Sequence, residues 1–309
     1  MSDLSVTSID VVIPVHQPTS ELRGTLRTLL EGTANQIILV CSETDTLSHW
    51  VETLPDDITT SSRLKVQWER PNQGPSYYRN AGIDASDADA VLFIDSDCEV
   101  SDGLVAAHQA AYNKYADTDA TVGAVAGVTN LYPVTGSKTE ESLLSSYYVG
   151  CFRKAERLEF VNWTPTSNLS VASKVLDDVR FDTSFPKVGG GEDIDICWQI
   201  RDAGYEIAGA GDAVVHHALW NPSREIFARM FRWGRAEYHL LKRHPERTRR
   251  SDSEYRRRLA EQASLDDIRD TCLQWAFTTF DLAGKNFETL LHGDLEELNT
   301  FLEDPDYEE

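Results

Sequence analysis

The N-terminal third of the chain alternates short apolar runs with amphipathic stretches. Residues 9–15 are apolar and β-branched, which predicts a buried strand. The next stretch predicts a helix that Thr19 or Ser20 caps, because its leucines recur on one face at positions 22, 26, 29 and 30. Further patterns predict strands at residues 36–40, 64–68 and 90–94, and a helix at residues 75–83 that a Gly-Pro pair opens. This alternation predicts a mostly parallel, doubly wound sheet, whose ligands bind at the carboxyl ends of the strands.

Beyond residue 94 the pattern is less regular. It predicts strands at residues 122–128, 168–172 and 205–207, and helices at residues 140–158, 193–203 and 224–242. From residue 249 onward the sequence reads as polar, amphipathic helical segments followed by an acidic tail. We therefore expect an α/β domain over residues 1–220 and a helical C-terminal extension over residues 221–309.

The chain is strongly acidic. Its 51 acidic and 29 basic residues give a net charge of −22, and this charge argues against nucleic acid as a partner. Only eight of the basic residues are lysine. A lysine-poor acidic surface is typical of a protein that works in concentrated salt, where charge repulsion is screened. An ordinary acidic cytosolic protein is the alternative.

Targeting and redox signals are absent from the sequence pattern. No apolar run approaches the ~20 residues that span a bilayer, and residues 1–10 lack the basic flank and apolar stretch of a signal peptide. The five cysteines are scattered and form no CxxC pair, as expected of reduced packing residues. We expect a cytoplasmic protein, with the inner face of the membrane as a second placement.

One of five Asp-x-Asp patterns stands directly after a predicted buried strand. Asp95-Ser96-Asp97 follows the apolar run at residues 90–94, at the sheet edge where ligands bind. Two carboxylates there can hold a hard divalent cation together with substrate phosphates. A solvated, Asp-rich loop is the alternative.

Two later segments carry candidate catalytic or metal-binding groups. Gly189-Gly190-Gly191 gives the backbone unusual freedom just before Glu192 and Asp193. A carboxylate there can act as a general base, or can be an ordinary acid at a helix start. His216-His217 follows an apolar run, and an imidazole beside a carboxylate-held cation suits Mn better than Mg. A histidine pair taken alone is more often structural.

A turn before the predicted helix at residues 75–83 is a candidate phosphate site. Asn72-Gln73-Gly74-Pro75 presents free N–H groups at the helix start, and Arg79 adds a cation one turn later. Together they can receive the diphosphate or ribose of a nucleotide. The alternative is a plain turn and an arginine paired with one of the many acids.

The order of these motifs resembles glycosyltransferase family 2. The matching segments are Val11-Val12-Ile13-Pro14-Val15, Asn72-x-Gly74 with Arg79-Asn80-x-Gly82, Phe93-Ile94-Asp95-x-Asp97, and Glu192-Asp193-x-Asp195 with Gly204-Tyr205. They cover roughly residues 9–217, and residues 231–235 look like a segment that often follows. The resemblance implies a GT-A fold, with a Rossmann-like nucleotide-binding half and an acceptor half on one mixed, mostly parallel sheet. It also implies an inverting transfer of a sugar from a nucleotide-sugar donor, with Mn or Mg as the divalent metal.

The resemblance also implies roles for single residues on the donor side. Asp95 would contact the ribose, and Asp97, next to Ser96, would hold the cation that bridges the diphosphate. Pro14 and Val15 would line the pocket for the base. The chain departs from the family pattern at Cys41-Ser42-Glu43, where members usually carry acids at the first two positions. Glu43 or Asp45 is expected to substitute there.

On the acceptor side, the resemblance makes Asp193 the catalytic base and Glu192 a residue that orients it or the acceptor. His217, or His216, would be the histidine beside the metal. The acceptor itself is a glycan, a protein or a lipid-linked molecule. Residues 224–250 carry nine basic and three acidic residues among apolar ones, which predicts a peripheral contact with an anionic membrane or a lipid-linked phosphate. The alternative is that the aromatic residues are core and the arginines pair with acids.

Two other functions remain open on the sequence. A catalytically silent glycan- or nucleotide-binding module of the same fold is one, and the presence of both Asp97 and Asp193 argues against it. A nucleotidyltransferase is the other. Such enzymes usually carry a loop rich in Gly, Arg and Lys after the first strand, whereas residues 16–20 of this chain hold neither Arg nor Lys.

Overall fold

The computed structural model describes residues 4–116, 118, 120–144, 151–185, 190–219, 223–245, 247, 276, 279–281, 283 and 284. The chain divides into two compact units. The first consists of Met1–Pro133, Tyr147–Lys187 and Glu192–Leu219, and the second of Val134–Ser146, Val188–Gly191 and Trp220–Glu309. The domain boundary that we placed at residue 220 stays a prediction.

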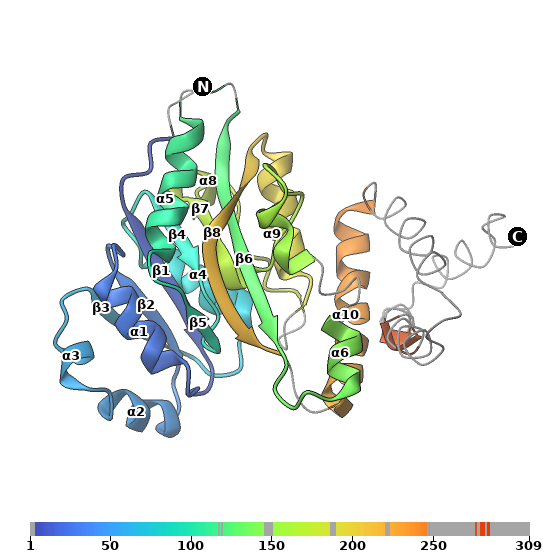
Figure 1. The fold of residues 1–309 in the computed structure, drawn as a ribbon, viewed down its shortest axis with the longest axis horizontal. Coiled ribbons are helices and arrows are strands. Elements are labelled where there is room, and N and C mark those ends of the chain that lie inside the picture. Colours follow the sequence, from blue (N-terminus) through green and yellow to red (C-terminus); the bar gives the residue numbers. More distant parts are fainter. Residues whose placement is uncertain are drawn as a thin grey trace, which may run out of the picture. The chain divides into compact units, whose positions relative to one another are not determined.

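The first unit is built on one eight-stranded sheet. Its strand order is β3 (Leu64–Glu69), β2 (Ile37–Ser42), β1 (Ile9–Val15), β4 (Ala90–Phe93), β7 (Leu169–Ala172), β6 (Val122–Tyr132), β8 (Glu206–Ala218) and β5 (Cys98–Val100) (Figure 1). Strands β7 and β5 run opposite to the other six. The mixed, mostly parallel sheet that we predicted is therefore confirmed.

The predicted buried strands form the centre of the N-terminal half of this sheet. β1 pairs in parallel with both β2 and β4, and all but one of its seven residues are buried. A strand flanked on both sides and covered on both faces is apolar along most of its length. This explains why residues 9–15 are apolar apart from Asp10, whose buried carboxylate accepts hydrogen bonds from Asn35, Gln36 and Ser86.

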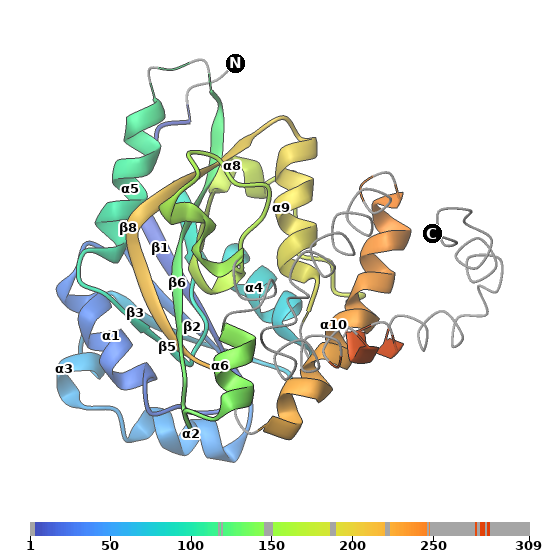
Figure 2. The ribbon, with the colours of Figure 1, turned by 45° about the vertical axis from the view of Figure 1, so that its right-hand side comes forward.

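Helices pack against this sheet (Figure 2). α4 (Pro75–Asp84) contacts β1 and β2, α5 (Leu104–Tyr115) contacts β6 and β8, and α9 (Glu192–Asp202) contacts β8. Gly82 lets α4 approach closely, because a Cβ at this position would lie 2.3 Å from the Val12 side chain. The remaining short helices of this unit are α1 (Leu22–Glu31), α2 (Asp45–Glu52), α3 (Asp56–Thr59), α8 (Ser173–Leu176) and the 3₁₀ turns η1 (Cys151–Glu156) and η2 (Thr166–Asn168).

The structure corrects three sequence-based expectations and adds elements that were not predicted. Helix α1 is capped by neither Thr19 nor Ser20, since Glu21 is its N-cap and makes no side-chain cap bond. The helix predicted at residues 140–158 is instead α6 (Lys138–Leu144) and, after residues 145–150 that lie outside the described part, the turn η1. The strand predicted at residues 205–207 is the 13-residue β8. Strand β5 and helix α5 were not predicted.

The second unit contains α6 and α10 (Ser223–Arg243), and α10 confirms the helix predicted at residues 224–242. Met230 and Leu240 on α10 are buried and Trp233 is half-buried, which favours the view that the apolar side chains of this stretch are core. Contact between residues 224–250 and a membrane stays a prediction. Within the described part of the chain, no helix is long and apolar enough to cross a bilayer. Most of the predicted C-terminal helical extension beyond residue 247 lies outside the described residues.

Candidate functional site

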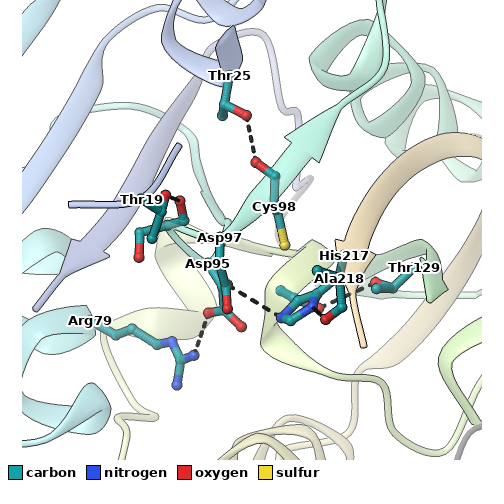
Figure 3. Close-up of polar contacts among 11 residues, drawn as sticks. Thr19, Thr25, Arg79, Asp95, Asp97, Cys98, Thr129, His217 and Ala218 are labelled. Atoms are coloured by element: carbon teal, nitrogen blue, oxygen red, sulfur yellow. Dashed lines mark hydrogen bonds and ion pairs between the residues drawn. The ribbon is translucent and has the colours of Figure 1, made fainter. Parts of the chain in front are cut away.

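The Asp95-Ser96-Asp97 loop leaves the carboxyl end of β4 and is held by two threonine hydroxyls. Thr19 donates a hydrogen bond to the Ser96 carbonyl and Thr25 donates one to the Cys98 carbonyl, each at 2.5 Å (Figure 3). The Cys98 amide donates to the Asp95 carbonyl at 3.1 Å, so the loop is a tight turn into β5. This anchoring fixes the direction of both carboxylates. Sequence reasoning missed both threonines, because their partners lie more than 70 residues away.

Asp97 faces His217 across the junction of β5 and β8. Cys98 pairs with His217 in the antiparallel ladder, and this register brings the Asp97 Oδ1 atom to 3.3 Å from the His217 Nε2 atom (Figure 3). The His217 Nδ1 atom lies 2.6 Å from the Ala218 carbonyl. If Nδ1 carries the proton and donates to that carbonyl, the Nε2 lone pair points toward Asp97, as in a metal-ligating histidine.

The electrostatics of His217 reflect this contact. Burial disfavours the charged imidazole, but the hydrogen bond and the negative charge of Asp97 outweigh it and raise the pKa of His217. A divalent cation between the two side chains would replace the proton in that role. Asp97 and His217 therefore favour a positive charge between them, carried either by a proton on His217 or by a divalent cation.

The two adjacent histidines lie on opposite faces of the sheet. Side chains alternate along a strand, and His217 is buried while His216 is only half-buried. His216 pairs in register with the exposed Glu99 rather than with Cys98. The structure thus brings His217, and not His216, to Asp97.

A third candidate ligand lies beside this pair. Ligand atoms of Asp97, Cys98 and His217 all lie within 4.8 Å of one another. Burial raises the pKa of the Cys98 thiol well above its ordinary value, so the sulfur is protonated in the absence of a metal. Mg prefers oxygen ligands, an imidazole nitrogen is better tolerated by Mn, and a sulfur ligand is typical of Zn.

Arg79 on α4 is buried and paired with two carboxylates. Only 4% of its surface is exposed. Its two terminal nitrogens lie 2.9 Å from the Asp95 Oδ1 atom and 3.1 Å from the Glu192 Oε1 atom. Both terminal nitrogens have protein partners, as in the alternative of an arginine paired with acids, and the direct contact of Arg79 with a diphosphate or ribose stays a prediction. Asn72 and Gly74, which precede α4, both have positive φ angles, 59° and 88°, and shape the turn at the start of the helix.

Glu192 and Asp193 begin α9, after Gly190 and Gly191, whose φ angles are 126° and 81°. Gly189 lies outside the described residues. Glu192 is buried and Asp193 is half-buried, and the Ile194 amide donates to the Asp193 carboxylate at 2.9 Å. Burial and the neighbouring charge of Glu192 raise the pKa of Asp193 to about 7, and Arg79 opposes this rise.

The predicted base pocket is supported by only some of its residues. Val15 is fully buried, so its side chain packs in the core, and its place in the lining of the base pocket stays a prediction. Pro14 is half-buried at the end of β1. Cys41 and Ser42 are fully buried in β2, whereas Glu43, directly after that strand, is exposed. Asp45 is exposed as well, so both acids that we expected to substitute here, Glu43 and Asp45, can meet a ligand.

Sequence comparison places the chain in a known family. A model described as "Glycosyl transferase family 2" matches residues 10–164, half of the chain. A "Pre-mycofactocin glycosyltransferase" from Mycobacterium tuberculosis, found in two strains, is 29% identical over 243 residues, which are 78% of this chain and 49% of the relative. The chain thus spans about half the length of the curated relatives that it matches.

Two solved structures share the fold. A mannosyltransferase from Pyrobaculum calidifontis, in complex with GDP-Man and Mn²⁺, has a TM-score of 0.55 and 18% identity, covering 89% of this chain and 73% of that chain. GalNAc-T7 with UDP, GalNAc and Mn²⁺ has a TM-score of 0.52 and 15% identity, covering 75% and 47%. These likenesses confirm the predicted GT-A fold. Because the family model matches half of the chain, from β1 through the Asp-x-Asp loop and beyond, the chain belongs to glycosyl transferase family 2.

Proposed function

We propose that this chain is an inverting, metal-dependent glycosyltransferase that moves a sugar from a nucleoside-diphosphate sugar to an acceptor hydroxyl. One observation carries the proposal. Asp97, in the loop after β4, faces His217 on β8, and Arg79 joins Asp95 of the same loop to Glu192, next to Asp193. A cation-binding pair connected to a carboxylate of raised pKa is what such a transfer requires. Membership of the family and glycosyltransferase relatives support this function.

On the donor side, the proposal assigns the base to Glu43 and Pro14 and the ribose to Asp95. Backbone N–H groups at the start of α4, around Gly74, would receive phosphate oxygens, because the first N–H groups of a helix have no partner within it. The two solved relatives bind UDP and GDP-Man with Mn²⁺, which supports a nucleoside-diphosphate donor. Either base is compatible with an exposed Glu43.

Asp97 and His217 would hold the divalent cation, with Cys98 beside them. When bound, such a cation neutralises the negative charge that develops on the departing diphosphate. The hydrogen bond to the Ala218 carbonyl orients the His217 ring, and the turn held by Thr19 and Thr25 orients Asp97. Mn is the expected metal, because an imidazole nitrogen suits it better than Mg.

Asp193 would act as the general base. The acceptor oxygen forms a bond to the anomeric carbon while the bond from that carbon to the diphosphate oxygen breaks, and the hydroxyl proton passes to the Asp193 carboxylate. A base with a pKa near neutrality is suited to this step, since it is ionised at neutral pH and still accepts a proton readily. Glu192, held by Arg79 at 3.1 Å, would keep the start of α9 in place.

The acceptor is proposed only as a class: the hydroxyl of a glycan, a protein or a lipid-linked molecule. The curated relatives act on pre-mycofactocin by name, but this chain spans about half of their length. Peripheral membrane contact through residues 224–250 would suit a lipid-linked acceptor. That contact is separate from the transfer chemistry.

The proposal is tested by release of nucleoside diphosphate from a panel of UDP-, GDP- and dTDP-sugars in high salt, with Mn, Mg or EDTA. Slow hydrolysis suffices, because water can replace an absent acceptor. We expect Mn-dependent turnover of one donor that Asp97→Ala and Asp193→Asn each reduce by at least about 100-fold. Asp87→Ala is the matched control, because Asp87 begins another Asp-x-Asp pattern and is exposed.

Three outcomes would contradict the proposal. Turnover that survives in Asp97→Ala or Asp193→Asn removes the assigned roles. If no donor is turned over, calorimetric titration with free UDP, GDP and dTDP in the presence of Mn decides, and absence of binding for all three rules out the donor site. Binding without turnover in the presence of candidate acceptors favours the catalytically silent module.

A further inference from the structure

Arg79 connects two parts of the site that are far apart in the sequence. It lies on α4, and its guanidinium contacts Asp95, in the loop after β4, and Glu192, the first residue of α9. The two acids are 97 positions apart, and Arg79 is the side chain that touches both. The donor-side loop and the start of the acceptor-side helix are thus joined by one guanidinium.

The burial of this bridge is costly. Arg79 and Glu192 are 4% and 6% exposed, and removing a charged pair from water costs several kcal/mol before the attraction is counted. The Arg79 Nε atom is also buried without a hydrogen-bond partner among the described residues. Apolar side chains would fill such a position more stably, so stability alone does not account for an arginine here.

A second set of contacts ties the same turn of α4 to the segment that leads toward α9. The Asn80 amide donates to the Phe181 carbonyl at 2.8 Å and accepts from the Phe181 amide at 3.1 Å. The Arg79 guanidinium carbon lies 5.5 Å from the centre of the Phe181 ring. That ring packs edge-on against Phe93 at the end of β4. Arg79 and Asn80 therefore connect α4 to the loop after β4, to the segment around Phe181 and to the start of α9.

We propose that Arg79 is a positioning residue that holds the start of α9, and with it Asp193, in register with Asp95 in the donor site. The proposal rests on the proposed function, since it makes Arg79 act on the transfer through its carboxylate partners rather than through contact with the donor. Asp193 follows Glu192 directly, so a shift of Glu192 moves the base. A displacement of about 1 Å at a reacting group costs on the order of 100-fold in rate.

The first test does not depend on turnover. Hydrogen–deuterium exchange of the full chain is measured for Arg79→Lys, which keeps the charge but cannot make two forked contacts, and for Asp95→Ala. We expect exchange in peptides covering α9 to rise by about fivefold or more in both variants, equal to a loss of roughly 1 kcal/mol in local opening. Asp97→Ala is the matched control: it removes a carboxylate two positions away that makes its contact with His217, and α9 should keep its protection.

Exchange that stays unchanged in α9 for Asp95→Ala overturns the proposal, because the bridge would then not hold the helix. The same holds if Asp97→Ala has an equal effect. Should Arg79→Lys fail to fold, as judged by circular dichroism, Asp95→Ala still breaks one end of the bridge and leaves the guanidinium paired with Glu192. In that case, the exchange of α9 in Asp95→Ala alone shows whether the bridge holds the helix.

The second test is kinetic. For Arg79→Lys, we expect kcat to fall by about 10- to 100-fold, while KM for the donor and the calorimetric Kd of its free diphosphate change by less than about threefold. A rise in KM and Kd with unchanged kcat would instead show a direct donor contact, as the sequence suggested, and would refute the positioning role. If the wild-type chain turns over no donor, the proposed function fails, whereas the exchange experiment still decides whether the bridge exists.

Discussion

The ionisation of Asp193 depends on its burial and on two charged neighbours that act in opposite directions. Burial and the adjacent Glu192 carboxylate raise its pKa, and Arg79 lowers it, with a net result of about 7. A carboxylate in water titrates near 4, so the site moves this group close to the pH at which it has to exchange a proton. The raised pKa of Asp193 has two consequences that can be measured.

The first consequence is a pH dependence of the transfer. Asp193 accepts a proton only when it is ionised, so kcat/KM should rise with pH and level off above its pKa, with a midpoint near 7. The measurement is kcat/KM for one donor from pH 5 to 9 at saturating Mn, so that competition between protons and the cation at His217 does not contribute. A profile that is flat from pH 5 upward would mean that Asp193 keeps an ordinary pKa or is not the base.

The second consequence concerns stability. The folded-state pKa of Asp193 is raised above its ordinary value, so this group stabilises the fold only while it is protonated, and that contribution is lost as pH rises from about 4 to about 7. Asp193→Asn removes the charge and keeps the oxygen that accepts from Ile194. We expect it to raise the free energy of unfolding at pH 8 by about 1–2 kcal/mol, with the gain shrinking toward pH 4. Urea unfolding at the two pH values measures this, and a variant that is less stable than the parent at pH 8 contradicts it.

At the scale of single elements, β8 determines which histidine reaches the metal site. Because alternate residues of a strand face opposite sides, a shift of one position in register would exchange His216 and His217. The register is fixed by pairing with β5 on one side and with β6 on the other. The register of β8 therefore determines that His217, and not His216, reaches the metal site.

This choice predicts unequal effects of two matched substitutions. His217→Ala should weaken Mn binding by at least about tenfold, and His216→Ala should leave it within about twofold. Mn binding is measured by electron paramagnetic resonance of the free ion, without any donor. Equal losses in the two variants would show that the register or the assigned ligand is wrong.

The contact of α4 with β1 predicts an opposite pair of effects for two helical glycines. A Cβ at Gly82 would meet the Val12 side chain at 2.3 Å, whereas a Cβ at Gly24 on α1 has nothing within 4 Å. Gly82→Ala should destabilise the fold by about 1–3 kcal/mol through overpacking. Gly24→Ala should stabilise it by up to about 1 kcal/mol, because alanine favours a helix. Denaturant midpoints compare the two, and a neutral Gly82→Ala would mean that α4 can move away from the sheet.

The sequence predicts best those elements whose signal is local. β1, β2, β3, β4, α4 and α10 were found because their apolar runs or capping residues lie within the element. β8 was seen only in part, since its first half is rich in Ala and Gly. Its register against β6 shifts where the Asn168 amide donates to the Val128 and Ala213 carbonyls at 3.0 and 2.9 Å. No local pattern reveals such a contact.

The site shows the same limit. The order of the motifs in the sequence predicted the acidic site residues Asp95, Asp97, Glu192 and Asp193. Only the structure shows which of them lie close together. That Arg79 pairs with Glu192, and that His217 faces Asp97, depends on segments more than 90 residues apart. α5 had a detectable pattern, with buried residues at 104, 108, 111 and 115, but two of these are His and Ala, which do not read as an apolar face.

At the scale of the whole molecule, the dominant feature is charge. A net charge of −22 with only eight lysines gives a surface whose self-repulsion opposes the compact state. Exposed ion pairs such as Arg27–Asp57 offset little of this, because such pairs contribute about 0–1 kcal/mol each. Stability should therefore depend on the screening of that repulsion by the solvent.

We expect the unfolding temperature to rise by at least about 5 °C when KCl is increased from 0.05 to 1 M, equal to roughly 1–2 kcal/mol for a chain of this size. The screening length falls from more than ~10 Å to ~3 Å over this range, so most of the rise should be complete before 1 M. Differential scanning calorimetry measures the temperature, and sucrose is the control, since it strengthens burial without screening charge. A rise with KCl that sucrose does not reproduce identifies relief of charge repulsion and supports adaptation to concentrated salt. A temperature that does not change with KCl would leave an ordinary acidic protein whose charges are already balanced locally.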